Sequence, residues 1–323
     1  MPIINITNCP ICNSSKTSKA FDAVDHFSTK ETFPINDCKS CGFRFTNNFP
    51  SEDSIGRYYD SPDYISHSDS KTGLINRLYH FFRKQMLKKK VNLVSKQVVS
   101  RQKDNIHLLD IGSGTGYFLN AAKEKGYTVT GIEKDNNARE YAVSNFELDI
   151  KDEQSLWSIE NESFDVITLW HVLEHMENLN EVVAKIKSIL KPDGVVILAL
   201  PNHNSYDAKK YKGYWAAYDV PRHLWHFTPD TVEKLLGKHH FNIIKQNTMP
   251  LDAFYISMLS EKYKGSGSLM QYIKGFTVGV TGYMRSLSDI NNSSSVIYIA
   301  KKESKCCPKQ ALCSNKGGIR SWQ

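Results

Sequence analysis

The most informative part of the chain is His107-Leu108-Leu109-Asp110-Ile111-Gly112-Ser113-Gly114-Thr115-Gly116-Tyr117-Phe118-Leu119. Its apolar start predicts a short strand, its glycines predict a turn, and its last residues begin a helix. Glycine has no Cβ and tolerates positive φ, so such a turn can pass close to a ligand. The unpaired N–H groups at the helix start face the same point. The stretch therefore predicts a nucleotide-type cofactor at a strand–turn–helix junction.

An acid after the next strand narrows the choice of cofactor. Thr128–Ile132 is a second apolar run, and Glu133 follows it directly. A carboxylate at that point can accept hydrogen bonds from two ribose hydroxyls. A dinucleotide would need its third glycine where the chain has Tyr117, whereas the third glycine is Gly116. The spacing favours S-adenosylmethionine over a dinucleotide.

The glycine turn resembles the first motif of the class I S-adenosylmethionine-dependent methyltransferases, acid-x-Gly-x-Gly-x-Gly. The resemblance covers about residues 104–302 and implies an α/β fold, a Rossmann-like, doubly wound, seven-stranded sheet. In this family the loop after the third strand holds adenine through an acid or amide, here Asp152 or Gln154. The expected cofactor-binding residues are Asp110, Gly112, Gly114, Gly116, Tyr117, Glu133, Asp152, Gln154 and Trp170.

A histidine- and glutamate-bearing string follows the apolar run Phe164–Leu169. His171-x-x-Glu174-His175 matches an inverted zinc-protease pattern, but its place at a strand end and the lack of a third ligand argue against that interpretation. A similar Glu-His string is found in the methyltransferases of quinone biosynthesis, which the later Pro201-Asn202 pair also resembles. Ligands meet at the carboxyl ends of parallel strands, so we expect His171 to face the cleft. The alternative is that it only caps or orients the next helix.

A second polar string, Asp219–Pro229, is set among aromatic residues and includes Arg222 and His223. Related enzymes carry an Arg-His-x-x-x-aromatic-Ser/Thr string at this location. We expect Arg222 to bind an acidic group of the acceptor, and His223 or His171 to act as the general base, because imidazole exchanges protons near neutral pH. Part of the string is structural, since Thr228 is placed to cap a helix.

Two Cys-x-x-Cys pairs near the start of the chain predict a zinc-ribbon-like module. Two such turns complete a closed tetrahedral Zn²⁺ site, which is structural because no coordination position is left open. The alternative is two unrelated reduced pairs. Charges within residues 9–45 nearly cancel, which argues against a nucleic-acid surface. The expected ligands are Cys9, Cys12, Cys38 and Cys41.

The chain thus divides into a zinc-ribbon-like module (1–50), a linker with cap helices (51–103), a methyltransferase domain (104–302) and a disordered tail (303–323). The polar, aromatic segment 58–67 is either a packed linker or a lid. From Leu74 to about Val99 the apolar spacing is helical, and Lys88-Lys89-Lys90 is expected to form a solvated face. The insert 251–287 is expected to form core helices, a dimer surface or a peripheral membrane contact, and the oligomeric state is left open.

The net charge of +7 is mild, and no signal peptide or apolar run of roughly 20 residues is present, so we expect a cytoplasmic protein. The Asp/Asn-Pro-Pro-aromatic tetrad of amino-group methyltransferases is missing. This favours an oxygen or carbon nucleophile on a small-molecule, sugar or lipid-linked acceptor. A zinc-ribbon RNA methyltransferase and a non-catalytic S-adenosylmethionine-binding module are the alternatives.

Overall fold

The computed structural model describes residues 2–59, 74–98 and 106–303, with side chains described from residue 83 onward in the middle segment. Most of the expected lid and all but Glu303 of the expected tail lie outside the described residues.

The central layer is a seven-stranded sheet in the order β12-β13-β10-β9-β6-β7-β8. The five strands from β6 to β10 run parallel, and β13 is antiparallel to both of its neighbours. This arrangement confirms the expected Rossmann-like α/β sheet. The strands are β6 (His107–Ile111), β7 (Thr128–Ile132), β8 (Asp149–Lys151), β9 (Phe164–Trp170), β10 (Leu190–Pro201), β12 (Phe241–Thr248) and β13 (Ser295–Lys302).

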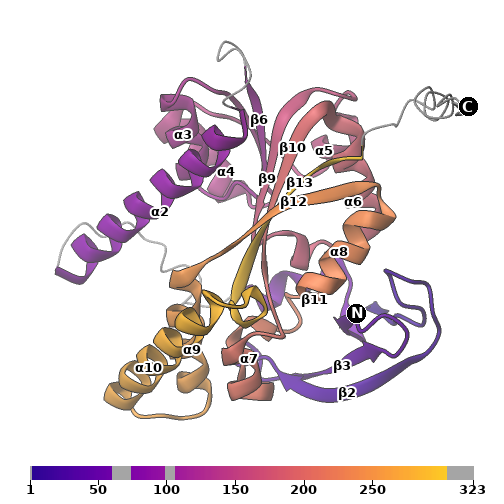
Figure 1. The fold of residues 1–323 in the computed structure, drawn as a ribbon, viewed down its shortest axis with the longest axis vertical. Helices are drawn as coiled ribbons and strands as arrows, with labels where there is room; N and C mark the ends of the chain where they lie inside the picture. Colours follow the sequence, from indigo (N-terminus) through magenta and orange to yellow (C-terminus); the bar gives the residue numbers. More distant parts are fainter. Residues whose placement is uncertain (1, 60–73, 99–105, 304–323) are drawn as a thin grey trace, which may run out of the picture.

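Helices cover both faces of this sheet because alternate residues of each strand point to opposite sides. Leu109 of β6 belongs to one core cluster with Ile186 and Leu235, whereas Leu108 belongs to the other with Val94 and Leu119. The first face is covered by α6 (Leu179–Ile189) and α8 (Pro229–Lys238). The second face is covered by α2 (Leu74–Val98), α3 (Tyr117–Glu124) and α4 (Asn136–Phe146). The sheet is therefore doubly wound, as Figure 1 shows.

The chain order reverses between β6 and β9, since β7 and β8 continue on one side of β6 and β9 and β10 lie on the other. Ligands of open α/β sheets bind at such a switch point, outside the carboxyl ends of the strands. The glycine turn after β6 and the His171 string after β9 both lie at this point.

The N-terminal residues form a second sheet in the order β11-β4-β3-β2. Its strands β2 (Thr17–Val24), β3 (Thr32–Cys38) and β4 (Arg44–Thr46) come from the start of the chain, but β11 (Trp225–His226) comes from the loop after β10. Trp225 pairs with Phe45, and His226 pairs with Arg44. A short ladder of β1 (Ile3–Ile4) and β5 (Phe49–Pro50) flanks this sheet. The module and the large domain therefore share one sheet, and the boundary near residue 50 stays a prediction.

The insert forms a helical hairpin of α9 (Pro250–Tyr263) and α10 (Ser268–Ser286), which projects from one end of the sheet in Figure 1. The helices pack closely because a Cβ on Gly275 or Gly279 would lie within 3 Å of Met258 or Phe254 of α9. None of the helices in the described residues is long and apolar enough to cross a membrane.

Shorter elements complete the fold. They are the 3-10 turns η1 (Glu52–Tyr58), η2 (Leu173–His175), η3 (Lys212–Tyr214), η4 (Ala216–Tyr218) and η5 (Ile290–Asn292) and the helices α5 (Ser155–Ser158) and α7 (Tyr206–Tyr211).

Candidate active site

The three glycines of the loop after β6 all have positive φ, at 72°, 53° and 80° for Gly112, Gly114 and Gly116. A Cβ on Gly112 would lie 2.3 Å from Val172 Cγ2, and one on Gly116 would lie 2.7 Å from Leu148 Cδ1. These two glycines are therefore required by packing. A Cβ on Gly114 would meet nothing within 4 Å, so the middle of the loop borders open space. This is the position at which the loop can approach a ligand.

Glu133 lies against the same glycine. The Gly114 N–H donates to Glu133 Oε2 at 2.7 Å, and the Asp135 N–H donates to Glu133 Oε1 at 2.9 Å. The carboxylate is thus fixed in direction at the tip of β7, while each oxygen keeps further lone pairs for a hydroxyl donor.

Asp110 lies beneath the loop and is only 2% exposed. Burial raises its pKa to about 7, although a hydrogen bond from Thr168 Oγ1 at 2.5 Å acts in the opposite direction. The ammonium of Lys90 acts in the same direction as that hydrogen bond, and it lies 4.3 Å from the ring centroid of Trp170. Lys90 was expected on a solvated face with Lys88 and Lys89. That expectation is wrong for Lys90 alone, which is partly buried over the cleft while its two neighbours are exposed.

The remaining expected cofactor residues are Tyr117, which begins α3 directly after this loop, and Asp152 and Gln154, which follow β8. The Tyr117 hydroxyl lies 2.8 Å from that of Tyr141, and Arg83 lies over the Tyr117 ring. Asp152 accepts hydrogen bonds from the N–H and hydroxyl of Ser155. Gln154 instead lines a separate pocket. Contact of these residues with a cofactor stays a prediction.

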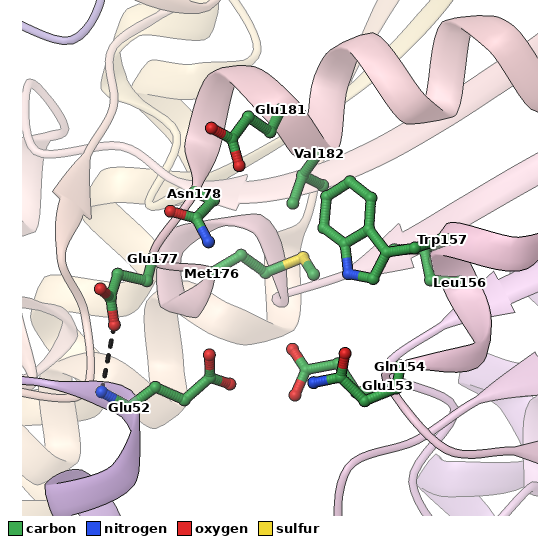
Figure 2. Close-up of a pocket in the computed structure, with 10 residues that line it drawn as sticks. All are labelled: Glu52, Glu153, Gln154, Leu156, Trp157, Met176, Glu177, Asn178, Glu181 and Val182. Atoms are coloured by element: carbon green, nitrogen blue, oxygen red, sulfur yellow. Dashed lines mark hydrogen bonds between the residues drawn. The ribbon is translucent and has the colours of Figure 1, made fainter.

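That pocket, shown in Figure 2, has a volume of about 240 Å³ and is bordered by carboxylates from η1, from the β8–α5 connection and from the start of α6. No glycine of the β6 loop lines it. Burial, followed by the nearby Glu52, raises the pKa of Glu153 to about 7. Lys134 partly balances this charge, with its Nζ 2.5 Å from Glu52 Oε1 and 3.8 Å from Glu153 Oε2.

His171 is held between two carboxylates. Its Nε2 lies 3.0 Å from Asp252 Oδ2, which belongs to α9, and its Nδ1 lies 3.4 Å from Glu174 Oε1. Burial lowers the pKa of His171, but the charge and hydrogen bond of Asp252, followed by Glu174, outweigh it and raise the pKa to about 10. His171 is therefore an imidazolium at neutral pH. The sequence placed His171 at the cleft but offered no indication of Asp252.

His175 and His223 lie together next to Glu174, with ring centroids 4.5 Å apart. His175 Nδ1 lies 3.0 Å from the Arg222 carbonyl oxygen, and His223 Nδ1 lies 2.8 Å from that of Ala217. A carbonyl oxygen only accepts, so we assign the proton to Nδ1 in both rings, which leaves both Nε2 lone pairs available. Burial, followed by the nearby His223, lowers the pKa of His175 to about 4.

Glu174 is fully buried, and its carboxylate pairs with His171 Nδ1 at 3.4 Å without forming a hydrogen bond of good geometry to any described residue. Ligand atoms of Glu174, His175 and His223 all lie within 4.8 Å of one another. This group could bind either a proton or a divalent cation.

Arg222 is 2% exposed and uses its donors within the protein. It binds Asp219 through Nε and Nη2, Asp25 of the N-terminal module through Nη2 at 2.9 Å, and the Tyr58 carbonyl through Nη1. The contacts tie the polar loop to the N-terminal module. Binding of an acceptor by Arg222 stays a prediction.

The four expected cysteines converge at the edge of the N-terminal sheet. Cys9 and Cys41 have sulfurs 3.5 Å apart, as do Cys12 and Cys38, and all four sulfurs lie within 4.8 Å of one another. A tetrahedral site with Zn–S bonds of ~2.3 Å has S–S edges of ~3.8 Å, so the sulfurs fit a zinc ion.

The large domain has the features of a Rossmann-like domain that binds a nucleotide-type cofactor. They are the glycine loop, a carboxylate placed to bind a ribose, and the point at which the strand order of the parallel sheet reverses. The profile of a family described as Methyltransferase domain matches residues 79–246, just over half of the chain. The chain belongs to this methyltransferase family.

Two curated relatives share its central region. The ubiquinone biosynthesis O-methyltransferase of Actinobacillus pleuropneumoniae serotype 5b (strain L20) is 33% identical over 106 residues, covering 29% of this chain and 45% of the relative. The ubiquinone biosynthesis O-methyltransferase of Rickettsia typhi (strain ATCC VR-144 / Wilmington) is 28% identical over 148 residues, covering 43% of this chain and 57% of the relative. The chain thus spans about half the length of these relatives. A SAM dependent methyltransferase from Archaeoglobus fulgidus aligns with a TM-score of 0.44 and 20% identity over 69% of this chain and 100% of that chain.

Proposed function

We propose that the protein is an S-adenosylmethionine-dependent methyltransferase acting on an oxygen or carbon nucleophile of a small-molecule, sugar or lipid-linked acceptor. The observation that carries this proposal is the open face of Gly114 beside the oriented carboxylate of Glu133 at the switch point. Glu133 would accept the ribose hydroxyls, and the ammonium of Lys90 would pair with the cofactor's carboxylate. The family match supports methyl transfer as the reaction.

The residues of the cleft suggest how the proton of the acceptor is removed. The sulfonium methyl of the cofactor is already activated, so the protein has to align the nucleophile and accept its proton. His171 is already protonated at neutral pH and is a poor base there. His223 has an Nε2 lone pair and a ring oriented by the Ala217 carbonyl. We therefore assign the base to His223, a cationic role to His171 and a positioning role to Arg222.

The curated relatives and the N-terminal module bear on the acceptor class. The names of the curated relatives describe an O-methyltransferase, which favours oxygen as the nucleophile. The four cysteines would hold a structural Zn²⁺. Their sheet is continuous with β11 beside the cleft, which favours a role in shaping the acceptor side of the protein over a separate nucleic-acid module.

Gly114→Ala tests the cofactor site because the added methyl group fills the space assigned to the ligand. Isothermal titration calorimetry should show S-adenosylmethionine binding at least about tenfold weaker, a loss of about 1.4 kcal/mol. Gly126→Ala is the matched control, since Gly126 also has positive φ and open space but lies at the far end of α3. Equal affinities of the two variants would contradict the proposed cradle.

Transfer is measured separately as S-adenosylhomocysteine release with a panel of phenolic, sugar and lipid-linked acceptors. Cofactor binding without release on any acceptor would support the non-catalytic alternative.

A further inference from the structure

The exposed apolar side chains of the protein are concentrated on the α9–α10 hairpin. Of the 15 large hydrophobic residues that are exposed in the described part of the chain, ten lie between residues 251 and 287. Such a concentration is typical of a binding surface, whereas isolated exposed hydrophobics are ordinary. The ten are Leu251, Tyr255, Leu269, Met270, Tyr272, Ile273, Phe276, Val280, Met284 and Leu287.

Helix α10 carries most of this surface and has two apolar faces. Its glycine face packs on α9, as the close approach of Gly275 and Gly279 shows. The opposite face repeats large apolar residues at helical spacing, with exposed fractions of 50% for Ile273, 60% for Phe276 and 60% for Met284. The small residues of α10 face α9 and α7, so the large side chains on the opposite face are not needed for the packing of the hairpin.

The charged residues of the segment that contains α10 are all cationic. No acidic residue occurs between Glu261 and Asp289, whereas this segment contains Lys262, Lys264, Lys274 and Arg285. Arg285 lies over the ring of Tyr206 at 4.5 Å, which holds its charge at the side of α10. An apolar helix face whose own segment carries only cationic charges complements a surface that is apolar inside and anionic outside.

We propose that the exposed face of α10 docks on the surface of an anionic phospholipid bilayer, with the helix lying along the surface. A second copy of the chain fits this face less well, because a twofold contact would place two cationic helices side by side.

The docking proposal does not depend on the proposed function. One consequence does rest on it: α9 contributes Asp252 to His171, so a docked hairpin would place the cleft next to the lipid and favour a lipid-linked acceptor.

Vesicle flotation of the full chain tests the proposal. We expect flotation with phosphatidylcholine vesicles that contain phosphatidylglycerol and much weaker flotation with phosphatidylcholine alone. Ile273→Ser with Phe276→Ser should lower binding at least about tenfold through the lost apolar contact. Lys274→Glu should lower it about fivefold or more, and only with the anionic vesicles.

The controls match these changes away from the hairpin. Ile244→Ser removes an isoleucine with the same 50% exposure on β12, and Lys125→Glu reverses an exposed charge at the end of α3. Both should float like the unchanged protein. Circular dichroism detects whether Ile273→Ser with Phe276→Ser fails to fold. In that case Lys274→Glu and its control Lys125→Glu test the proposal.

Three outcomes would overturn the proposal. They are no flotation with either vesicle, flotation that the α10 variants do not change, and a dimer in light scattering that Ile273→Ser with Phe276→Ser dissociates without any vesicle binding. The last result would assign the face to a second copy.

Discussion

His171 shows how a single side chain acquires its chemistry from residues distant in the sequence. Glu174, three residues later, is its local partner, but Asp252 of α9 makes the shorter contact. With both carboxylates present, the protonated imidazolium persists to a pH far above the ordinary histidine pKa of ~6.5. His171 is a candidate general base from its sequence alone, but its two carboxylate neighbours keep it in the cationic form.

Removing one carboxylate should return His171 toward ordinary behaviour. Nuclear magnetic resonance of the imidazole should show titration near pH 10 in the unchanged protein and a clearly lower pKa in Asp252→Asn, because Asp252 raises the pKa most. The folded pKa is raised, so the stabilisation is complete below the unfolded pKa of ~6.5 and is lost as pH rises through about 10. An unchanged titration in Asp252→Asn would show that the ion pair does not form.

At the scale of elements, the two cysteine turns hold strands that have little core of their own. Cys9 and Cys38 are buried in the same cluster as Phe43 and Phe45, next to the ladder between β4 and β11. A metal that joins the turns would therefore stabilise strands from the start of the chain together with β11 from the loop after β10.

Replacing one ligand should release the metal. In Cys12→Ser we expect loss of a single bound zinc by mass spectrometry and a melting temperature at least about 5 °C lower. Cys12 is exposed, so the change removes little packing. Ser40→Ala alters the second turn without removing a ligand and should keep the zinc. Full metal content in Cys12→Ser would contradict the four-cysteine site.

At the scale of the whole molecule, Arg222 joins the N-terminal module to the large domain. Asp25 is fully buried and binds Arg222, and it also accepts hydrogen bonds from the N–H groups of Phe27, Ser28 and Thr29. Burial tends to raise the pKa of Asp25, but Arg222 and these donors hold it below its usual value. Without Asp25, the buried guanidinium of Arg222 keeps Asp219 alone as a charged partner, and its positive charge is less well compensated.

Asp25→Asn should therefore lower the free energy of unfolding by about 3 kcal/mol at neutral pH. Asp22→Asn is the control, since Asp22 pairs with Lys19 on the surface, and it should cost less than about 1 kcal/mol. Urea unfolding followed by tryptophan fluorescence measures both. The loss in Asp25→Asn should diminish in acid, where the carboxyl of the unchanged protein also takes up a proton. Similar stabilities for the two variants would show that the buried pair does not hold the parts together.

Much of the fold followed from local sequence. The continuous apolar run of β9, the glycines after β6 and the cap at Thr228 each depend on neighbours within a few residues, and each occurs as expected. The burial of Lys90 could not be predicted in this way, because it depends on how α2 is rotated about its axis where it packs on the sheet. A run of three lysines does not indicate which of them that rotation turns toward the sheet.

Local sequence was enough to predict the alternating strands and helices of the large sheet, the glycine loop with its following acid, and the four cysteine ligands. Packing of distant segments brings Asp252 to His171, Asp25 to Arg222 and β11 to the N-terminal sheet, and no local pattern predicts these contacts. The physical reason is the range of the interactions. Backbone propensity and hydrophobic periodicity act between near neighbours in the chain, whereas a buried charge takes its partner from whichever segment the packed core brings beside it.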